Sequence, residues 1–582
     1  MLWLIFEILK NMKNYRYSWI AIFITILIFT GCSQDFLNRP PVDAITDANF
    51  YKTDAEVMSA TALLYNRVWF DYNDKASYEI GDFRGGTAFN PYGSTGYVKF
   101  NLTGDDPDMN AGWNAFFTVI GQSNLAIQNI KKYAGAAVTE PIKTEAIAEA
   151  RFMRACAYRN LVMCWGAVPI IENNQTVLTD TTIARNTISS IWKFLTYEMR
   201  AIANDLPETA YATGRVTKWS AEGMLARFYL TRAGVESDNG VRNQQFLDSA
   251  KYYSDRVIKL SGRVLMPDYA SLFKYPYDNN SESLFELQWV YSTIWGVSNS
   301  TPAYLAFSPD IANGDGWGGS VGATWWMLQK YEGIDAYGTT GDTLKGRTLD
   351  QRLHATFMLP GASYPEISQR ITLANGKDSI QRLIYPNSVT AQVSTVAIKK
   401  YICGKAADMG GQASSQHYPN DTYMLRLAEM YLIYAEAELG NQTQTTDATA
   451  IAYFNTIHTR AGLGAIIKGF ITADDIFNER ILEFSMEGMS MYDLSNLYYY
   501  NPVKALAILN LQDRGLFAVY PDVFPNPTQW TFIKTSWDNP NTTPDRNINA
   551  YDGNFYLPIP TTELAGSPNL LKPPVDYYTK VK

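Results

Sequence analysis

The chain has 582 residues, a net charge of -8 at pH 7 and an aromatic content of 14%. This length allows one large domain or several ordinary ones, each with a well-buried core. The acidic balance argues against a nucleic-acid ligand and against a basic patch that would bind a membrane surface.

The chain opens with a pattern typical of protein export. A basic start and an apolar run over residues 18–29 lead to a small pair and then Cys32. This run is too short for a membrane-spanning helix, which needs roughly 20 apolar residues, but it suits a secretory signal. A cysteine directly after small residues is typical of a bacterial lipoprotein signal, in which acyl chains on the cysteine anchor the protein. We predict a signal peptide over residues 1–31 with Met12 as the true start, and lipidation of Cys32; an ordinary cleaved signal is the alternative.

Helical periodicity dominates two long parts of the chain. Small residues recur on the predicted helices and would let neighbouring helices approach closely, as in helix-pair repeats of the tetratricopeptide kind. We predict a mainly-α fold in a single domain over residues 32–582, with the helical scaffold mainly in 48–265 and 420–500. The strongest periodic segments are Gly112–Tyr133, Thr139–Gly166, Thr217–Gly234, Asp421–Gly440, Ala450–Gly462 and Asp475–Leu494.

Two long aromatic-rich stretches separate these helices. They cover residues 78–100 and 269–411. Loops of this length inside a compact domain are usually functional or disordered, and their aromatic content argues against disorder. We predict that both stretches form a loop-rich ligand region with short β elements.

Cysteine and histidine patterns exclude several chemistries. Cys156 and Cys164 lie on one predicted helix, roughly 12 Å apart at 1.5 Å per residue, which is beyond the ~7 Å limit for a disulfide. With Cys403 they make an odd set, so we expect buried, unpaired thiols. The three histidines are isolated, and neither zinc-binding spacing nor a nucleophile elbow, Walker or Rossmann motif is present.

Charged motifs do not predict an active site. Glu479, Glu483 and Glu487 share one helix face, whereas a glycosidase needs two carboxylates roughly 5–9.5 Å apart across a cleft. An ion-pair face with Arg480 is the simpler explanation, and Glu149, Arg151 and Arg154 are interpreted in the same way. No catalytic residue is predicted.

Two acidic stretches, residues 103–110 and 312–319, are rich enough in oxygen to bind calcium. Neither has a complete ligand pattern, and turn chemistry is the simpler explanation. We therefore predict no cofactor and no defined metal site, with calcium left as a possibility.

Motifs throughout the chain resemble the SusD/RagB family of Bacteroidetes outer-membrane nutrient-binding lipoproteins. In chain order they are CSQDFLNRPP from Cys32, TEAIAEARFMRACAYRNLVMCWGAVPII from Thr144, GRVTKWSAEGMLARFYLTRAG from Gly214, ESLFELQW from Glu282, YMLRLAEMYLIYAEAELG from Tyr423, NTIHTRAGLG from Asn455, ERILEFSMEGMSMYDL from Glu479 and FYLPIPTTELAGSPNL from Phe555.

The resemblance implies a fold, a place and a role. It implies a SusD-like fold with tetratricopeptide-like units, held at the cell surface in the outer membrane by a lipid anchor. It also implies capture of an oligosaccharide or polysaccharide and its delivery to a SusC-like, TonB-dependent transporter, without enzymatic activity. A surface-tethered glycoside hydrolase, a transporter scaffold and a peptide-binding member of the family are the alternatives.

The neighbours of each aromatic residue indicate whether it packs in the core or meets ligand. Trp113, Trp165, Trp219 and Trp289 lie in apolar helix or strand patterns and are predicted core residues. Other aromatics lie among glycines and polar residues, where a rigid ring could cover the apolar face of a sugar while neighbouring polar groups bind its hydroxyls. Packing within the loops is the alternative explanation. The predicted glycan-binding residues are Trp317, Trp295, Tyr92, Asp82, Arg84 and Asn90.

Overall fold

The protein is described here by a computed structural model. The structure describes residues 50–90, 95–180, 182–336, 343–373, 375–386, 396–515, 517–534 and 548–577. The predicted signal peptide, Met12, Cys32 and Tyr92 lie outside these ranges.

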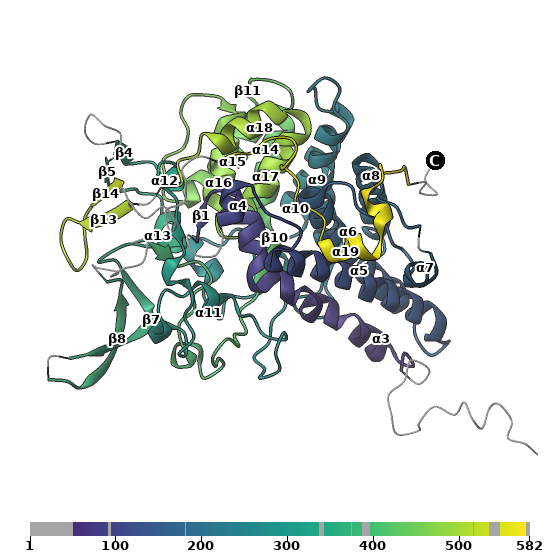
Figure 1. Cartoon of the computed structure of the whole chain (residues 1–582), viewed down its shortest axis with the longest axis horizontal. Helices are drawn as coiled ribbons and strands as arrows, with labels where there is room; N and C mark the ends of the chain where they lie inside the picture. The colour runs from purple at the N-terminus through teal and green to yellow at the C-terminus, as the bar shows by residue number, and fades with distance from the viewer. Residues whose placement is uncertain are drawn as a thin grey trace, which may run out of the picture.

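Helices form one half of the molecule and short strands and loops the other, so the predicted mainly-α, helix-pair scaffold is confirmed (Figure 1). The helices are α3 (Asp54–Ala60), α4 (Thr95–Lys99), α5 (Pro107–Tyr133), α6 (Glu140–Trp165), α7 (Asn174–Thr179), α8 (Ile188–Ile202), α9 (Lys218–Val235), α10 (Gln244–Leu260), α11 (Thr301–Leu305), α12 (Trp325–Leu328), α13 (Arg352–Thr356), α14 (Leu427–Leu439), α15 (Ala448–Arg460), α16 (Ala473–Phe484), α17 (Ser490–Tyr500), α18 (Pro502–Asn510) and α19 (Thr561–Gly566).

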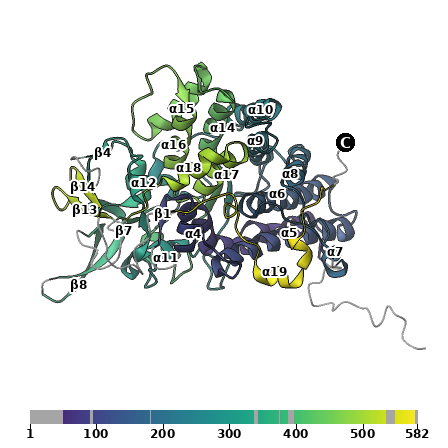
Figure 2. The same ribbon diagram turned by 45° about the horizontal axis from the view of Figure 1, so that its top comes forward.

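Successive helices pack side by side along the scaffold. Helix α5 packs on α6, α8 on α9, α9 on α10, α10 on α14, and α14 on α15, and Figure 2 shows this series rising from α5 towards α15. Helix α5 begins earlier than its periodicity predicted because Asp106 caps it, accepting a hydrogen bond from the Met109 N–H, and Pro107 occupies its first position. Among the described residues, no helix is both long and apolar enough to cross a membrane.

Two predicted helices differ from the structure. The segment 422–426 is not helical but forms strand β10, because it pairs with the distant strand β2. The segment 475–494 forms two helices, α16 and α17, instead of one. Between them Met486 and Gly488 have φ values of 62° and 72°, a left-handed backbone that no helix can continue through.

The described strands pair only in antiparallel ladders. They form two four-stranded sheets, in the orders β1-β3-β9-β6 and β13-β14-β5-β4, and the two-stranded pairs β10-β2, β11-β12 and β7-β8. The strands are β1 (Ala88–Phe89), β2 (Ser283–Leu287), β3 (Gly322–Ala323), β4 (Ile334–Ala336), β5 (Thr343–Gly346), β6 (Phe357–Met358), β7 (Ser363–Thr372), β8 (Asp378–Ile384), β9 (Ala397–Ile398), β10 (Thr422–Arg426), β11 (Gln444–Thr445), β12 (Ile471–Thr472), β13 (Phe517–Pro521) and β14 (Trp530–Lys534).

The stretch over residues 78–100 is not the exposed loop that its sequence suggested. Its described part contains a π-helical turn, Glu79–Phe83, followed by β1 and α4, and most of its side chains are buried. Tyr78, Phe83 and Ala88 belong to the hydrophobic core of the loop-rich half, which is separate from the larger core of the helical half. This buried stretch therefore connects the two halves of the molecule.

Candidate functional site

Trp317 projects from a backbone that is held rigidly. Its side chain is 62% exposed, while its N–H donates to the Ala303 carbonyl over 3.1 Å. The flanking glycines explain how the chain can lie so close: a Cβ on Gly316 would be 2.4 Å from the Ser308 backbone, and one on Gly318 would be 2.1 Å from the Leu305 carbonyl oxygen. Because the backbone that carries it is already fixed, this exposed indole loses less conformational entropy when it contacts a ligand.

Trp295 is another exposed indole of the loop-rich half, at 50%. Its carbonyl accepts a hydrogen bond from Arg67 Nη1 over 2.9 Å. Its ring makes edge-to-face contacts with Phe70, at 5.0 Å between centroids, and with His417, at 6.1 Å. These contacts hold the ring in place and leave half of it open to solvent.

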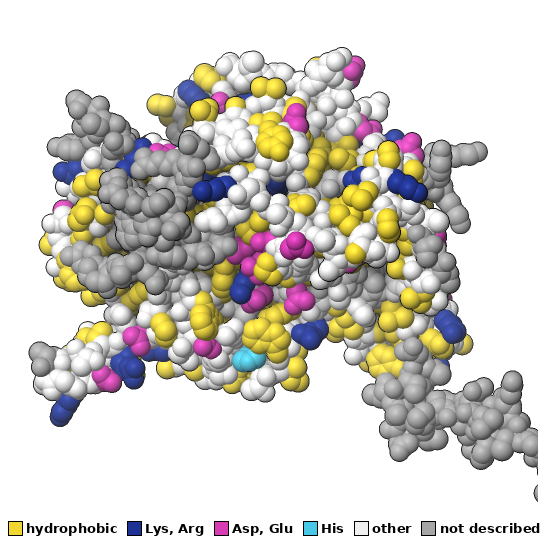
Figure 3. Space-filling view, viewed as in Figure 1, with side chains coloured by type: hydrophobic (Ala, Val, Ile, Leu, Met, Phe, Trp, Pro, Cys, Tyr) yellow, Lys and Arg dark blue, Asp and Glu magenta, His cyan; other side chains and the backbone are white. Residues whose placement is uncertain are grey.

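The segment 414–417 connects the two tryptophan loops. Besides the contact of His417 with Trp295, Ser414 Oγ accepts a hydrogen bond from the Tyr291 hydroxyl over 3.2 Å. On the other side, the Ser415 hydroxyl donates to the carboxylate of Asp315, two residues before Trp317. We call the resulting surface the aromatic face; it consists of Tyr291, Trp295, His417 and Trp317. At the lower edge of Figure 3, over the loops below α11, hydrophobic side chains lie beside a histidine.

The sequence did not single out Tyr291 or His417. Tyr291 is 40% exposed, although it follows directly from the alternating pattern that ends in the buried Trp289. His417 is partly buried and distant in sequence from both tryptophans. The one available signal was the density of Ser, Gln and His in a segment without helical or strand periodicity.

Of the polar residues predicted to bind sugar, Asn90 lies beside the aromatic face. Its Oδ1 accepts a hydrogen bond from Ser320 Oγ over 3.0 Å, and Ser320 ends the short turn that follows Trp317. Asn90 is partly exposed. It is therefore the one predicted polar residue, among those described, that the structure bonds to the turn after a predicted stacking residue.

Asp82 lies in the interior instead. Its carboxylate accepts hydrogen bonds from the N–H groups of Met486 and Gly488, over 2.9 and 2.7 Å, and from the Thr87 hydroxyl over 2.8 Å. Burial raises its pKa to about 6. Every described hydrogen-bond partner of Asp82 is internal, so its carboxylate stabilises the break between α16 and α17. We therefore do not propose Asp82 as a residue that contacts the glycan.

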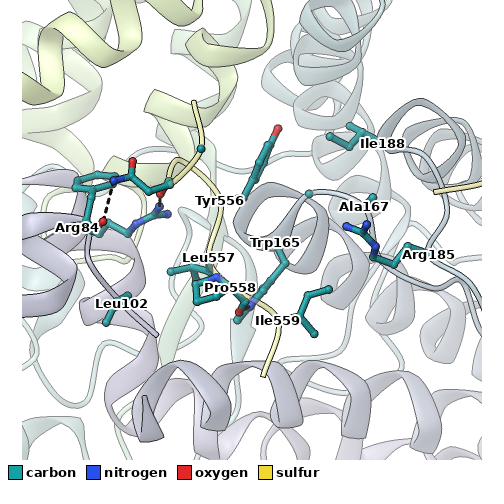
Figure 4. Close-up of a pocket in the computed structure, with 14 residues that line it drawn as sticks. Arg84, Leu102, Trp165, Ala167, Arg185, Ile188, Tyr556, Leu557, Pro558 and Ile559 are labelled. Carbon is teal, nitrogen blue, oxygen red and sulfur yellow. Dashed lines mark hydrogen bonds between the residues drawn. The ribbon is translucent and has the colours of Figure 1, made fainter. Parts of the chain in front are cut away.

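Arg84 is also buried, in the wall of a cavity of about 370 Å³ shown in Figure 4. Its guanidinium donates to the carbonyls of Asn554 and Phe555 and lies 4.6 Å from the Phe100 ring centroid. Burial lowers its pKa to about 10. The C-terminal segment forms the adjoining wall and is attached to α6 by a 3.0 Å hydrogen bond from Trp165 Nε1 to the Pro558 carbonyl. Arg84 thus secures this segment and does not reach the aromatic face.

The three glutamates on one helix face belong to a buried ionic network. Glu483 is paired with Arg352, Arg426 and Arg460, and Glu479 with Arg352 and His458. Burial alone would raise the pKa of Glu483, but Arg460, Arg426 and Arg352 outweigh it and hold this pKa well below its usual range. Glu479 and Glu483 are buried, and Glu487 pairs with Lys400 and Arg426. The ion-pair interpretation is therefore confirmed, but the predicted partner is wrong, because Arg480 pairs with Glu429 and Asp493.

Other sequence assignments, for core tryptophans, ion pairs and thiols, agree with the structure. Trp113, Trp165, Trp219 and Trp289 are buried core residues. Arg151 and Arg154 pair with Glu198, and Glu149 pairs with Arg215. The described thiols Cys156, Cys164 and Cys403 are free and buried.

Comparison with known proteins gives the family. The profile of the SusD family matches residues 281–577, and a profile described as "Starch-binding associating with outer membrane" matches residues 89–230. A SusD-like protein of Bacteroides ovatus is 34% identical over 96% of this chain and 98% of its own length. SusD-like protein P2 of Formosa agariphila is 25% identical over 84% of this chain and 92% of its own.

Solved structures agree with these relatives. A crystal structure with xylogluco-oligosaccharide is 32% identical and superposes with a TM-score of 0.76, covering 90% of this chain and 99% of the other. A laminarin-binding SusD-like protein shares the fold at 18% identity, with a TM-score of 0.61 and coverage of 89% and 98%. The chain belongs to the SusD family.

Proposed function

We propose that this protein is a cell-surface glycan-binding lipoprotein. It captures an oligosaccharide or polysaccharide on its aromatic face and delivers it to a TonB-dependent transporter of the outer membrane. The observation that carries this proposal is the pair of exposed indoles, Trp295 and Trp317, on two loops that the segment 414–417 connects. Sugar rings present apolar faces to such rings, and hydrogen bonds to nearby polar groups fix their orientation.

The polar groups that could bind hydroxyls surround these rings. Asn90, Asp315 and Ser414 are partly exposed and come from three different segments, so they could contact hydroxyls on either side of a stacked ring. The relative solved with xylogluco-oligosaccharide is 32% identical, which makes a neutral, β-linked glucan with side chains the first ligand class to test.

Titration of the purified protein against a panel of neutral glycans tests the proposal and separates it from the alternatives. A binding protein is retarded in native gels that contain its glycan and releases no reducing sugar during long incubation. Release of reducing sugar would favour the tethered hydrolase. Failure to bind any glycan, together with binding of peptides, would favour a peptide-binding member of the family.

The lipid anchor is tested separately at Cys32. On this proposal, several acyl chains on Cys32 hold the protein at the membrane, and several chains hold far better than one. We therefore expect Cys32→Ala to abolish incorporation of labelled fatty acid and to release the protein from the washed outer-membrane fraction. Retention of this variant in the membrane would mean that another segment anchors the protein. Gentle detergent extraction of the wild-type protein should also recover a large barrel protein with it.

A further inference from the structure

The cavity shown in Figure 4 is lined, among the described residues, by two arginines and by no acidic side chain. Arg84 directly follows the π-helical turn Glu79–Phe83, and Arg185 lies shortly before α8. In Figure 4, Arg84 lies on one side of the cavity and Arg185 on the other, with the rings of Trp165 and Tyr556 between them. Two positive charges therefore border a hollow whose other walls are mostly apolar.

The structure provides no carboxylate to balance these charges. Within the part of the chain that the structure describes, no ion pair includes Arg84, Arg185 or the neighbouring Arg514. Arg514 is fully buried, and its Nη2 donates to the Arg84 carbonyl over 2.8 Å. Backbone carbonyls accept from part of each guanidinium, as the Lys572 carbonyl does from Arg185 Nη2 over 2.9 Å. The Nε atoms of Arg84 and Arg185 are buried and have no hydrogen-bond partner among the described residues.

Buried cations without a counter-ion are costly. Burial lowers the pKa of Arg84 to about 10, and burial together with the charge of Arg84 lowers that of Arg514 to about 9. Both groups still carry their charge at neutral pH, so the folded protein bears the cost. An anion in the cavity would offset it, and a carboxylate is an anion that a guanidinium binds with two parallel hydrogen bonds.

The apolar walls of the cavity are held in place. The Tyr556 ring lies against Gly166, where an added Cβ would be 3.4 Å from the ring, and the Leu557 N–H donates to the Cys164 carbonyl over 2.8 Å. The volume of about 370 Å³ lies within the range of about 300–1,000 Å³ that is typical of small-molecule sites. A simple inorganic anion would fill little of this space, so the walls favour an anion with an apolar body.

We propose that this cavity binds a small organic carboxylate, with its apolar body between Trp165 and Tyr556 and its charged group at Arg185. Arg185 is partly exposed and accessible to a ligand that enters from solvent, while the buried Arg84 adds positive charge from the interior. The bound ligand joins the end of α6 to the C-terminal segment. Its site shares no lining residue with the aromatic face, so it is separate from the proposed glycan site.

Calorimetric titration with matched acids and amides tests the site. The probes are phenylacetate and indole-3-acetate, each compared with its neutral amide. We expect the acids to bind at one site per chain and the amides to bind at least about tenfold more weakly, because charge-assisted hydrogen bonds are roughly twice as strong as neutral ones. The acids should also raise the melting temperature, since they bind the folded chain. Equal binding of acid and amide, or no binding of any probe, would overturn the proposal.

Two variants locate the ligand. Arg185→Gln removes the charge but keeps a polar side chain, so it should weaken binding of the acids by about tenfold or more and change binding of the amides little. Ala167→Leu fills part of the cavity without touching either arginine and should weaken both kinds of probe. The control Arg200→Gln removes an exposed arginine from α8 and should bind as the wild type does.

Glycan titration of the same variants separates this site from the aromatic face. Arg185→Gln and Ala167→Leu should keep the glycan affinity of the wild type, and Trp317→Ala should keep its affinity for the acids. Acid binding that survives both Arg185→Gln and Ala167→Leu would place the ligand elsewhere and overturn the proposal. Acid binding that is lost in Trp317→Ala would also overturn it, because the ligand would then lie on the aromatic face.

Discussion

Asp82 shows how one buried side chain can determine the path of distant backbone. It lies in a π-helical turn near the N-terminus, yet its carboxylate satisfies the N–H groups of Met486 and Gly488 between α16 and α17. Neither segment alone predicts this contact, because the partners are about 400 residues apart in the chain. Sequence neighbours therefore suggested a surface residue near Tyr92, and only the packed structure shows the interior role.

Replacing Asp82 tests this role. We expect Asp82→Ala to lower the free energy of unfolding by roughly 2–6 kcal/mol, because it leaves two buried N–H donors without an acceptor and each costs about 1–3 kcal/mol. Urea unfolding measures the loss, with the exposed Asp105→Ala as a control that should change little. The folded variant should bind glycan as the wild type does; full stability with lost affinity would mean that Asp82 contacts the ligand after all.

The exposed tryptophans were easier to recognise from their neighbours. Trp317 is surrounded by glycines and Trp295 by polar residues, and no local pattern offers either one a buried face. Local composition thus predicted their exposure. It could not predict that Ser414, Ser415 and His417 connect their loops, since that depends on how three separated segments fold together.

At the scale of the element, the turn that carries Trp317 depends on close packing of backbone against backbone. Its two flanking glycines lie against the end of α11 and the residues after it, where any Cβ would overlap backbone atoms. Periodicity predicted the long helices α5, α6 and α9 within a few residues of their observed ends. It was wrong for 422–426 and across the α16–α17 break, where pairing with β2 and the contact with Asp82 overrule local preference.

Adding a single methyl group to this turn should therefore weaken glycan binding by displacing Trp317. We expect Gly318→Ala to weaken glycan affinity severalfold and to lower the melting temperature slightly, because the new Cβ would lie 2.1 Å from the Leu305 carbonyl oxygen and push Trp317 out of place. Gly464→Ala is the matched control, since nothing lies within 4 Å of its new Cβ. If Gly318→Ala binds and melts as the wild type does, the turn is not rigidly held.

At the scale of the whole molecule, buried ion pairs join the helical scaffold to the loop-rich half. Glu483 of α16 pairs with Arg352 of the loop-rich half as well as with Arg426 and Arg460. Within the scaffold, Glu429 lies between Arg227 and Arg480 and extends the buried ionic network. Burial would raise the pKa of Glu429, but Arg227 and Arg480 outweigh it and lower this pKa to about 2. A buried pair of this kind costs much when one partner loses its charge.

The network predicts how stability depends on acidity. A carboxylate with a folded-state pKa below its unfolded value of about 4.3 stabilises the fold above that value, and the contribution is lost as the pH falls towards the folded pKa. For Glu429 alone this amounts to about 3 kcal/mol. Asp82, with its pKa raised to about 6, acts in the opposite direction and loses its contribution as the pH rises through 6. We expect urea midpoints to fall steeply only below about pH 4; midpoints that stay level down to pH 2 would contradict the network.

The central claim is that the aromatic face binds the glycan, and one variant tests this claim most directly. Calorimetric titration of Trp317→Ala with the tightest-binding glycan of the panel, first a xyloglucan oligosaccharide, should show an affinity at least about tenfold lower than the wild type, since stacking on the indole contributes roughly 1.5–3 kcal/mol. Its melting temperature should change little because the side chain is 62% exposed. Tyr252→Ala, which removes a 56% exposed aromatic from α10, should retain full affinity. A Trp317→Ala protein that melts several degrees lower and binds normally would make Trp317 a loop anchor, and one that is stable and binds normally would place the ligand elsewhere; either result would contradict the account.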